Sequence, residues 1–230
     1  MSNISLEPMK LTRADGKSVD VSFYNNFDIK NVEILDIKHL KFEGKKTKDI
    51  TKSDIRDVVF KGEEKLYLQN NKSKIVAGLS NKNLGKIIST IFTRDVESRH
   101  AYLKKEIISN VDTIFYAAIP ILKHPELKKP LLYNTQTIHR LALPLKIGGL
   151  IFLVMITVKE RTDFKDILID EFTIYDLYSK VSENEKPSDS SSTASARINP
   201  VTFRGQYQTV NYSINDLIEF VKCSMTKIQE

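Results

Sequence analysis

The chain has 230 residues, of which 41% are hydrophobic and 28% are charged. These values are ordinary for a globular protein, and the length suffices to bury a core without covalent cross-links. The single cysteine, Cys223, excludes an intramolecular disulfide and a cysteine-rich zinc site. The longest apolar run, residues 150–158, is far shorter than the roughly 20 residues of a transmembrane helix. We therefore expect no membrane contact and a cytoplasmic location, either in the producing cell or in a target or host cell that receives the protein.

The net charge of +6 is concentrated in the middle of the chain. Lys and Arg outnumber Asp and Glu by 15 to 6 in residues 72–161, compared with 13 to 12 before that segment and 7 to 11 after it. A positive surplus of this kind suits a polyanion such as nucleic acid. A solvated lysine-rich surface explains the same numbers, so charge alone leaves both interpretations open.

Turn residues and apolar spacing divide the first half of the chain into short elements. Residues 1–27 are polar and aperiodic, which indicates an N-terminal arm. Thr51 and Ser53 are candidate N-caps of a short helix. Residues 95–119 carry the clearest apolar stripe, which predicts one long helix capped by Asp95 and ended by a proline. The other expected elements are a strand in 31–42, two strands in 65–80, a helical turn in 81–92 and a loop in 122–137.

Residues 137–160 predict a β-hairpin with a two-residue turn at Gly148 and Gly149. Apolar density and β-branched residues favour strands over a helix here. With this turn, the numbers of any two facing residues add up to 297. Arg140 then lies opposite Thr157 on the partner strand.

The two faces of this hairpin differ, because side chains alternate along a strand. One face is apolar core with His139 at its rim. The other face is apolar near the turn and becomes polar at the open end through Arg140, Thr157 and Lys159. Apolar residues on both faces predict a central position in the sheet. Pro144 lacks an amide hydrogen, which indicates a bulge or an edge near that residue.

The last third of the chain predicts another alternating strand, a serine-rich segment, and a final strand and helix. Ser213 is the candidate N-cap of that helix. The chain thus divides into an N-terminal arm (1–27), an α+β core (28–180), a flexible Ser-rich loop (181–199), and a strand and helix that complete the core (200–230).

The polar open end of the hairpin is the strongest candidate site. The chain has no glycine-rich phosphate loop and no histidines at metal-ligand spacing, so we expect no cofactor and no metal. Cleavage of RNA through its 2′-hydroxyl needs a base, an acid and cations that stabilise the charge on phosphorus. His139, Arg140, Thr157 and Lys159 can supply these parts. A strand end that turns polar where it meets solvent explains the same residues.

Three further residues are possible accessories to this site. His100 lies in the predicted long helix among basic residues and could provide a second acid or base. Thr173 and Tyr175 lie on the strand after the hairpin, where the tyrosine could stack on a base. Each also has an ordinary explanation, because histidines are common on helix surfaces and tyrosines pack in sheets. His124 precedes a proline in the predicted loop, which favours a structural role.

The order of elements over residues 50–178 resembles a known family. The segments that carry the resemblance are "LYLQNNKSKIVAGLSNKNLGKIIS", "ESRHAYLKKEIISNVDTIFYAA" and "IHRLALPLKIGGLIFLVMITVKE". They resemble the nuclease-like domains of phage and mobile-element polyvalent proteins, which are grouped with the barnase, EndoU, colicin-type tRNase and RelE fold class. The resemblance implies an α+β fold, with N-terminal helices packed on a central antiparallel sheet of about four strands and a closing C-terminal helix. The N-terminal arm, the very apolar second hairpin strand and the Ser-rich insertion depart from it.

The resemblance also implies an activity, namely metal-independent cleavage of RNA by a toxin or effector domain. The expected partners are RNA, tRNA included, and an immunity or antitoxin protein. His139 would act as base or acid, Arg140 and Lys159 would hold the phosphate, and Thr157 would orient it.

Two alternatives remain open at this point. The first is a non-catalytic protein-binding or nucleic-acid-binding module on the same fold, such as a phage accessory protein or a secreted effector. The second is a transferase that uses a nucleotide cofactor. It would need an ordered glutamate in a cleft, for which Glu160 and Glu171 are the candidates. Whether the chain is an enzyme therefore stays open.

Overall fold

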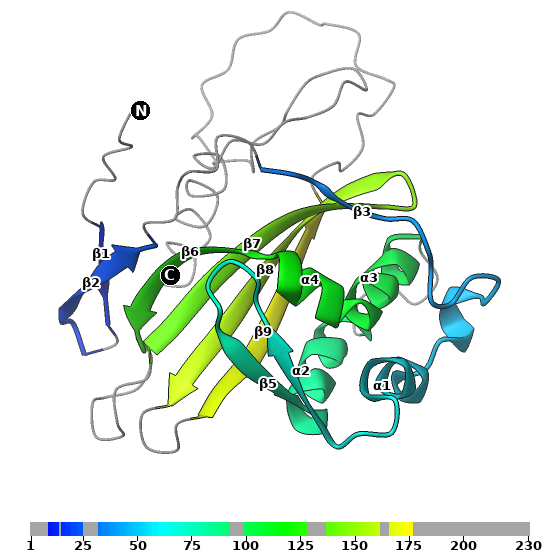
Figure 1. Ribbon diagram of the computed structural model, residues 1–230, viewed down its shortest axis with the longest axis horizontal. Coiled ribbons are helices and arrows are strands. Elements are labelled where there is room, and N and C mark those ends of the chain that lie inside the picture. Colours follow the sequence, from blue (N-terminus) through cyan, green and yellow to red (C-terminus); the bar gives the residue numbers. More distant parts are fainter. Residues whose placement is uncertain are drawn as a thin grey trace, which may run out of the picture.

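A computed structural model (Figure 1) describes residues 9–13, 15–24, 32–92, 99–127, 137–161 and 166–176. Within these ranges nine strands form one mixed sheet, accompanied by four α-helices and a short 3-10 helix. The strands are β1 Met9–Thr12, β2 Ser18–Phe23, β3 Leu35–Ile37, β4 Lys65–Gln69, β5 Val76–Ser80, β6 Ile119–Pro125, β7 Thr137–Ile147, β8 Leu150–Arg161 and β9 Asp166–Asp176. The helices are η1 Thr47–Asp49, α1 Lys52–Phe60, α2 Asn81–Phe92, α3 Arg99–Ser109 and α4 Val111–Ala117.

The prediction of about four antiparallel strands is wrong. The strand order is β1-β2-β6-β7-β8-β9-β5-β4, with β3 beside β7. The β3–β7 and β5–β9 pairs are parallel, and the other pairs are antiparallel. The helices are not N-terminal either, because three strands precede α1. The predicted closing helix, like the final strand and the Ser-rich loop, lies outside the described residues.

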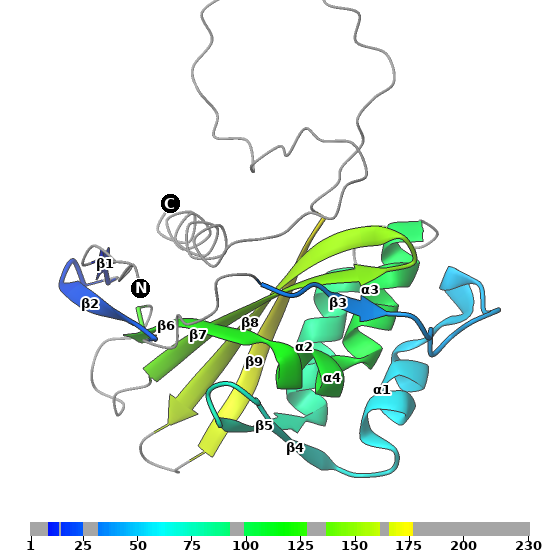
Figure 2. The same ribbon diagram turned by 45° about the horizontal axis from the view of Figure 1, so that its top comes forward.

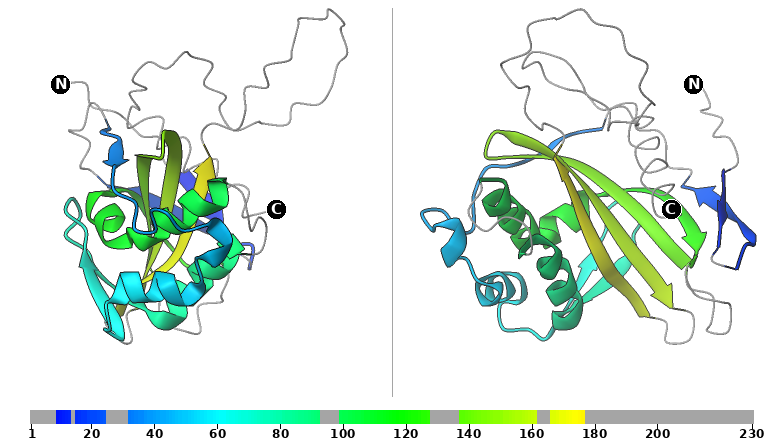
Figure 3. Two further views of the ribbon diagram at one scale, coloured as in Figure 1. Left: turned by 90° about the vertical axis from the view of Figure 1, so that its right-hand side faces the viewer. Right: turned by 180° about the vertical axis from the view of Figure 1, so that it is seen from behind.

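The extra strands come from segments that lack a clear pattern of their own. The N-terminal arm contains the β1–β2 hairpin, and the predicted loop at 122–137 begins with the last four residues of β6. Strand β6 contains two prolines, yet it pairs with β2 on one side and with β7 on the other. Pairing with these partners stabilises a segment whose own composition indicates a loop. The rear view shows β1 and β2 at the end of the sheet farthest from α1 (Figure 3, right).

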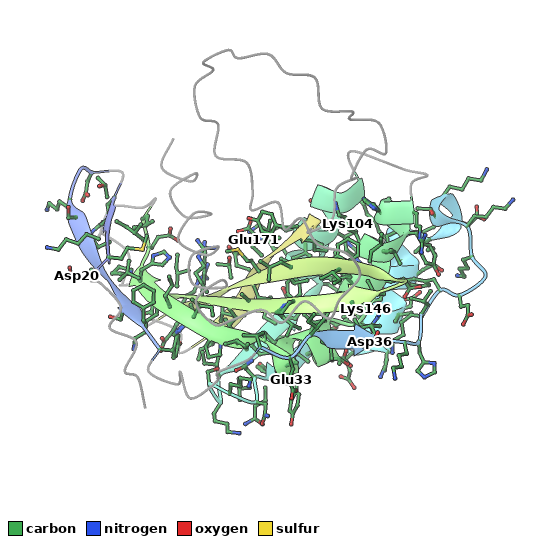
Figure 4. The ribbon with its side chains drawn as sticks, turned by 90° about the horizontal axis from the view of Figure 1, so that it is seen from above. Asp20, Glu33, Asp36, Lys104, Lys146 and Glu171 are labelled. Atoms are coloured by element: carbon green, nitrogen blue, oxygen red, sulfur yellow. The ribbon has the colours of Figure 1, made fainter. Side chains whose placement is uncertain are left out.

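The central hairpin has the predicted register. Strands β7 and β8 pair from Thr137↔Glu160 to Ile147↔Leu150, so every facing pair adds up to 297. Gly148 and Gly149 form the turn with φ of 55° and 79°, the positive values that a tight hairpin turn requires. Lys146 at this end of β7 lies beside Asp36 of β3 (Figure 4).

Pro144 lies in a central strand where its missing amide hydrogen costs no sheet bond. Counting outward from the two-residue turn, residue 144 belongs to a pair whose amides point away from β8. On that other edge, β6 pairs with β7 only as far as Ala142, and β3 pairs from Leu145 onward. Pro144 therefore lies between the part of β7 that pairs with β6 and the part that pairs with β3, and it does not form a bulge.

The α-helices lie on one side of the long strands (Figures 1 and 2). We call this side of the sheet the helical face and the opposite side the distal face. The larger core lies between the helical face and α1–α4 and includes Leu141, Leu143, Phe152, Val154 and Ile156. A smaller core on the distal face includes Ala142, Leu153 and Met155, together with residues of β1, β2 and β6. Both assignments agree with the predicted alternation.

The predicted helix at 95–119 is two helices in its described part, α3 and α4. The side chain of Ser109 donates to the carbonyl of Lys105, and that of Asn110 donates to the carbonyl of Glu106. Such side-chain bonds to the preceding turn compete with continuation of a helix. Asn110 has φ of −106° and ψ of 26°, and α4 starts after it. The shorter helix α1 agrees with its prediction, since Thr51 caps it in a reciprocal capping box with Asp54.

Candidate functional site

Three polar residues form a row across the distal face. Arg140 of β7 pairs with Thr157 of β8, which pairs with Glu171 of β9. The Nη1 atom of Arg140 donates to Oγ1 of Thr157. Arg140 and Thr157 are buried, and Glu171 is exposed on β9, well away from the turn end of the hairpin (Figure 4). The row therefore runs from the interior of the sheet to solvent.

Arg140 is a buried cation that does not use all of its hydrogen-bond donors within the described part of the chain. Its residue is 8% exposed, and its Nε finds no hydrogen-bond partner among the described residues. Burial lowers the pKa of the guanidinium, while the nearby charges of Glu171 and Glu126 oppose that change. An arginine side chain nevertheless stays protonated in a protein. The site thus holds a permanent positive charge whose hydrogen bonds are incompletely used.

His124 lies on the same face, two residues along β6 from the partner of Arg140. Its Nδ1 is 2.7 Å from the carbonyl oxygen of Pro125, which can only accept, so Nδ1 carries the hydrogen. Nε2 then has a free lone pair, and it finds no hydrogen-bond partner among the described residues. Burial lowers the pKa of His124 to about 4, and the charge of Arg140 acts in the same direction. His124 is therefore neutral near pH 7.

Lys159 belongs to a network of ion pairs at the end of this face. Its Nζ lies 3.2 Å from Glu126 and 3.0 Å from Asp170. Asp170 also accepts from Lys86 of α2 at 2.9 Å. Burial lowers the pKa of Lys159, but its bonds to the two carboxylates outweigh burial and raise the pKa overall. The two lysines outweigh burial at Asp170 in the same way and lower its pKa. Lys159 is thus a charged and partnered cation.

His139 lies on the helical face, so the structure does not bring it to the same face as Arg140. Its Nε2 is 3.2 Å from Glu160, and its Nδ1 accepts from the hydroxyl of Tyr24 just after β2. Burial lowers the pKa of His139, and the bond to Glu160 opposes this. Burial raises the pKa of Tyr24 to about 12. Both ring nitrogens of His139 therefore have partners, which distinguishes it from His124.

The comparison with known families identifies the chain. Residues 43–168, more than half of the 230, match the model of the family described as large polyvalent protein-associated domain 3. The chain belongs to this family. The match confirms the resemblance to domains of phage and mobile-element polyvalent proteins, whereas the nuclease-like activity stays a prediction. The search of curated proteins and the search of solved structures found no match.

The large polyvalent protein-associated domain 3 segment covers much of the candidate site. It includes His124, Arg140, Thr157 and Lys159 and ends within β9, before Glu171.

None of the helices in the described ranges has the length and apolar composition that crossing a membrane would require.

The three accessory candidates lie on different faces of the sheet. Thr173 and Tyr175 follow Glu171 on the distal face, opposite Met155 and Leu153. Burial and the charge of Glu171 raise the pKa of Tyr175. His100 of α3 lies on the helical face, with its ring centroid 6.2 Å from that of Phe152. Tyr175 therefore joins the Arg140 row, and His100 does not.

Sequence reasoning assigned His124 to a loop and left Glu171 outside the cluster. For Glu171 a signal existed, because alternation placed it on one face with Thr173 and Tyr175. The pairing of β8 with β9 has a bulge, because Thr157 pairs with Glu171 and the next residue, Val158, pairs with Ile169. The bulge interrupts the alternation of β9, so the side chain of Ile169 lies in the helical core instead of on the distal face. For His124 no local signal existed, because its role depends on β6 being a strand.

Proposed function

We propose that this domain is an endoribonuclease-like toxin or effector domain that cleaves RNA without a metal ion. The 2′-oxygen of one nucleotide forms a bond to the adjacent phosphorus, and the bond from that phosphorus to the next 5′-oxygen breaks. A base accepts the proton of the 2′-hydroxyl, and an acid donates a proton to the departing 5′-oxygen. The products are a cyclic 2′,3′-phosphate and a free 5′-hydroxyl.

The observation that carries the proposal is a pair of nitrogens on the distal face that find no hydrogen-bond partner within the described ranges, Nε of Arg140 and Nε2 of His124. A neutral imidazole with a free lone pair can act as a general base at pH 7. A fixed guanidinium can stabilise the charge that develops on the phosphate oxygens. Thr157 accepts from Arg140 and holds it in place. Tyr175, on the same face as Arg140, carries its hydroxyl proton at pH 7 and is the candidate acid.

Lys159 takes a supporting role in this mechanism. Two carboxylates already compensate its charge, so it is less suited to bind a phosphate than Arg140. It holds Glu126 and Asp170 at the end of the row, and both carboxylates contribute to the field at Arg140. RNA would approach from the exposed side of the row at Glu171.

The burial of the row favours a second candidate function. His124 is 2% exposed, and Arg140 is 8% exposed. A phosphate can contact them only if this face opens. If it stays closed, the row supports a non-catalytic binding module of the same family, and catalysis does not occur.

The test is cleavage of a fluorophore- and quencher-labelled RNA by the purified chain. We expect Arg140→Ala to lower the cleavage rate by about 100- to 1000-fold and His124→Gln by at least about 100-fold. His139→Gln is the matched control on the helical face and should keep most of the rate. Thermal unfolding of each variant separates loss of chemistry from loss of fold.

Three results would change the assignment. If wild type leaves the RNA intact, the binding module replaces the nuclease. If His139→Gln removes cleavage and His124→Gln does not, the base is His139. If all three folded variants cleave like wild type, the Arg140 row has no catalytic role.

A further inference from the structure

The β4–β5 hairpin is an exposed and apolar part of the described surface. Among the described residues, the exposed large hydrophobic side chains are Tyr67 of β4 (67% exposed), Val76 of β5 (47%) and Tyr116 of α4 (55%). Tyr116 is next to the turn of this hairpin, because its carbonyl accepts from the amide of Asn71 at 3.0 Å. The side chains of Tyr67 and Val76 share one face of the hairpin, because Tyr67 is paired with Gly78, two residues along β5 from Val76. Exposed large side chains on a common face indicate a binding surface.

The same part of the chain carries positive charge only. Residues 65–80, which form β4, β5 and the turn between them, contain three lysines and no aspartate or glutamate. Two of them, Lys72 and Lys74, lie in the exposed or half-exposed turn of the hairpin. A partner with negative charge and flat apolar groups fits such a surface. Single-stranded RNA has both, in its phosphates and its bases.

Tyr67 is placed to present its ring. It lies opposite Gly78, which has no side chain to cover it. Lys65 extends along this surface, since a Cβ added to Gly78 would lie 2.6 Å from its Cε. The Nζ of Lys65 is 4.8 Å from the centroid of the Tyr67 ring. The exposed ring and its adjacent cation resemble the stacking platforms that bind bases without sequence preference.

Tyr67 shares the distal face with the candidate site. Leu66 and Leu68 pack against the helical core, so Tyr67 between them points the other way. The pairings Tyr67↔Gly78, Gly78↔Leu168 and Leu168↔Lys159 connect β4 to β8 in one cross-strand row. Three strand spacings amount to about 14 Å. A short single strand that stacks on Tyr67 can therefore extend to the Arg140 row.

We propose that Tyr67 and the lysines of the β4–β5 hairpin form a binding site for single-stranded RNA. This inference rests on the proposed function for its choice of RNA, and it specifies that the RNA is unpaired. Paired bases are already stacked on each other and cannot stack on an exposed ring. The hairpin thus positions the strand, and the Arg140 row acts on it.

The experiment measures binding by fluorescence anisotropy with the full chain. The probe is a short labelled RNA with every 2′-hydroxyl O-methylated, so that it cannot be cleaved by 2′-attack. We expect Tyr67→Ala to weaken binding about 5- to 100-fold and Tyr67→Phe to stay within about twofold of wild type. A duplex RNA probe should bind both variants like wild type. Lys72→Gln should make the logarithmic salt dependence of binding shallower by about 0.7.

The outcomes separate this inference from the cleavage proposal. If Tyr67→Ala binds the single strand as tightly as wild type, or wild type binds no RNA, the inference is overturned and the patch belongs to a protein partner. If binding depends on Tyr67 but unmodified RNA stays intact, the inference stands and the cleavage proposal fails. If unmodified RNA is cleaved equally by wild type and Tyr67→Ala, with equal binding, only the cleavage proposal survives.

Discussion

Two pairs of buried polar residues in this domain differ in how fully their hydrogen bonds are satisfied. In α3, both carboxylate oxygens of Glu106 accept from main-chain amides, those of Lys41 and Phe42, at 2.7 Å. The Nζ of Lys105 donates to the carbonyls of Thr47 and Ile50 at 2.7 and 3.0 Å. On the distal face, Arg140 and His124 each keep one nitrogen without a partner in the described part of the chain.

The difference separates scaffold from candidate site. Buried polar groups are almost always hydrogen-bonded, because leaving one unsatisfied costs about 1–3 kcal/mol. The Lys105–Glu106 pair follows this rule and fixes the segment before α1 onto α3. The Arg140–His124 pair departs from it, and such departures are frequent where a ligand or a reacting group completes the bonds. Substitutions at the two pairs test whether this distinction holds.

Glu106→Ala has the largest expected effect on stability. It leaves the amides of Lys41 and Phe42 without an acceptor in a buried place, so we expect the free energy of unfolding to fall by about 3 kcal/mol. Glu106→Gln keeps one acceptor and should cost about half as much. Urea denaturation measures both, with exposed Glu63→Ala as the control near zero. A loss below about 1 kcal/mol would show that Glu106 is not part of the scaffold.

Acid should destabilise the domain through His124. Its folded pKa of about 4 lies below the ordinary 6.5, so between these values the unfolded chain binds a proton that the folded chain does not. The stabilising contribution is complete above pH 6.5 and is lost as pH falls to 4, on the order of 3 kcal/mol. Between pH 7 and 4.5, the free energy of unfolding of His124→Gln should therefore fall less than that of wild type, by a difference on the order of 3 kcal/mol.

The control for this pH dependence is His39→Gln, which changes an exposed histidine. It should lose as much stability as wild type over the same range. Denaturant titrations at the two pH values give the comparison directly. If His124→Gln and wild type lose stability equally, folding leaves the pKa of His124 at its ordinary value, and the buried neutral imidazole assigned to this site is wrong.

Two matched methionine substitutions compare the buried cations. Lys105→Met leaves two buried carbonyls without a donor, and we expect it to cost about 2 kcal/mol. Arg140→Met removes a buried charge with few bonds and replaces it by apolar volume, so stability should change by less than about 1 kcal/mol in either direction. Denaturant midpoints at pH 7 suffice for the measurement. Equal losses at the two sites would remove the distinction between scaffold and site.

The sequence predicted those features of the fold and the site that depend on short-range chemistry. Glycines 148 and 149 determined the register of β7 and β8, and the register determined that Arg140 faces Thr157. Alternation along β7 likewise places His139 and Arg140 on opposite faces. The capping residue Thr51 located the start of α1. In each case the decisive residues are neighbours in sequence or are related by one tight turn.

The features that failed depend on partners far along the chain. Strand β6 forms because β2 and β7 pair with it on either side. Its own sequence, with two prolines and a lysine, does not indicate a strand. The amides that Glu106 binds are more than sixty residues away. His124 gains its free nitrogen and low pKa only when β6 is buried between its neighbours. Loop-like composition therefore concealed both a strand and the best candidate base.

The smallest predicted effect tests the satisfied histidine. In His139, Nε2 donates to Glu160, so Nδ1 must accept, and the hydroxyl of Tyr24 is its donor. Tyr24→Phe removes this donor, and we expect a loss of about 1 kcal/mol in the free energy of unfolding. Tyr116→Phe, at an exposed ring, is the control and should change nothing measurable. If Tyr24→Phe is equally neutral, the bond from Tyr24 does not hold the N-terminal strands to the hairpin, and His139 has an unused nitrogen as His124 does. The two histidines would then differ only in the face they occupy, and the cleavage rates of their glutamine variants would decide between them.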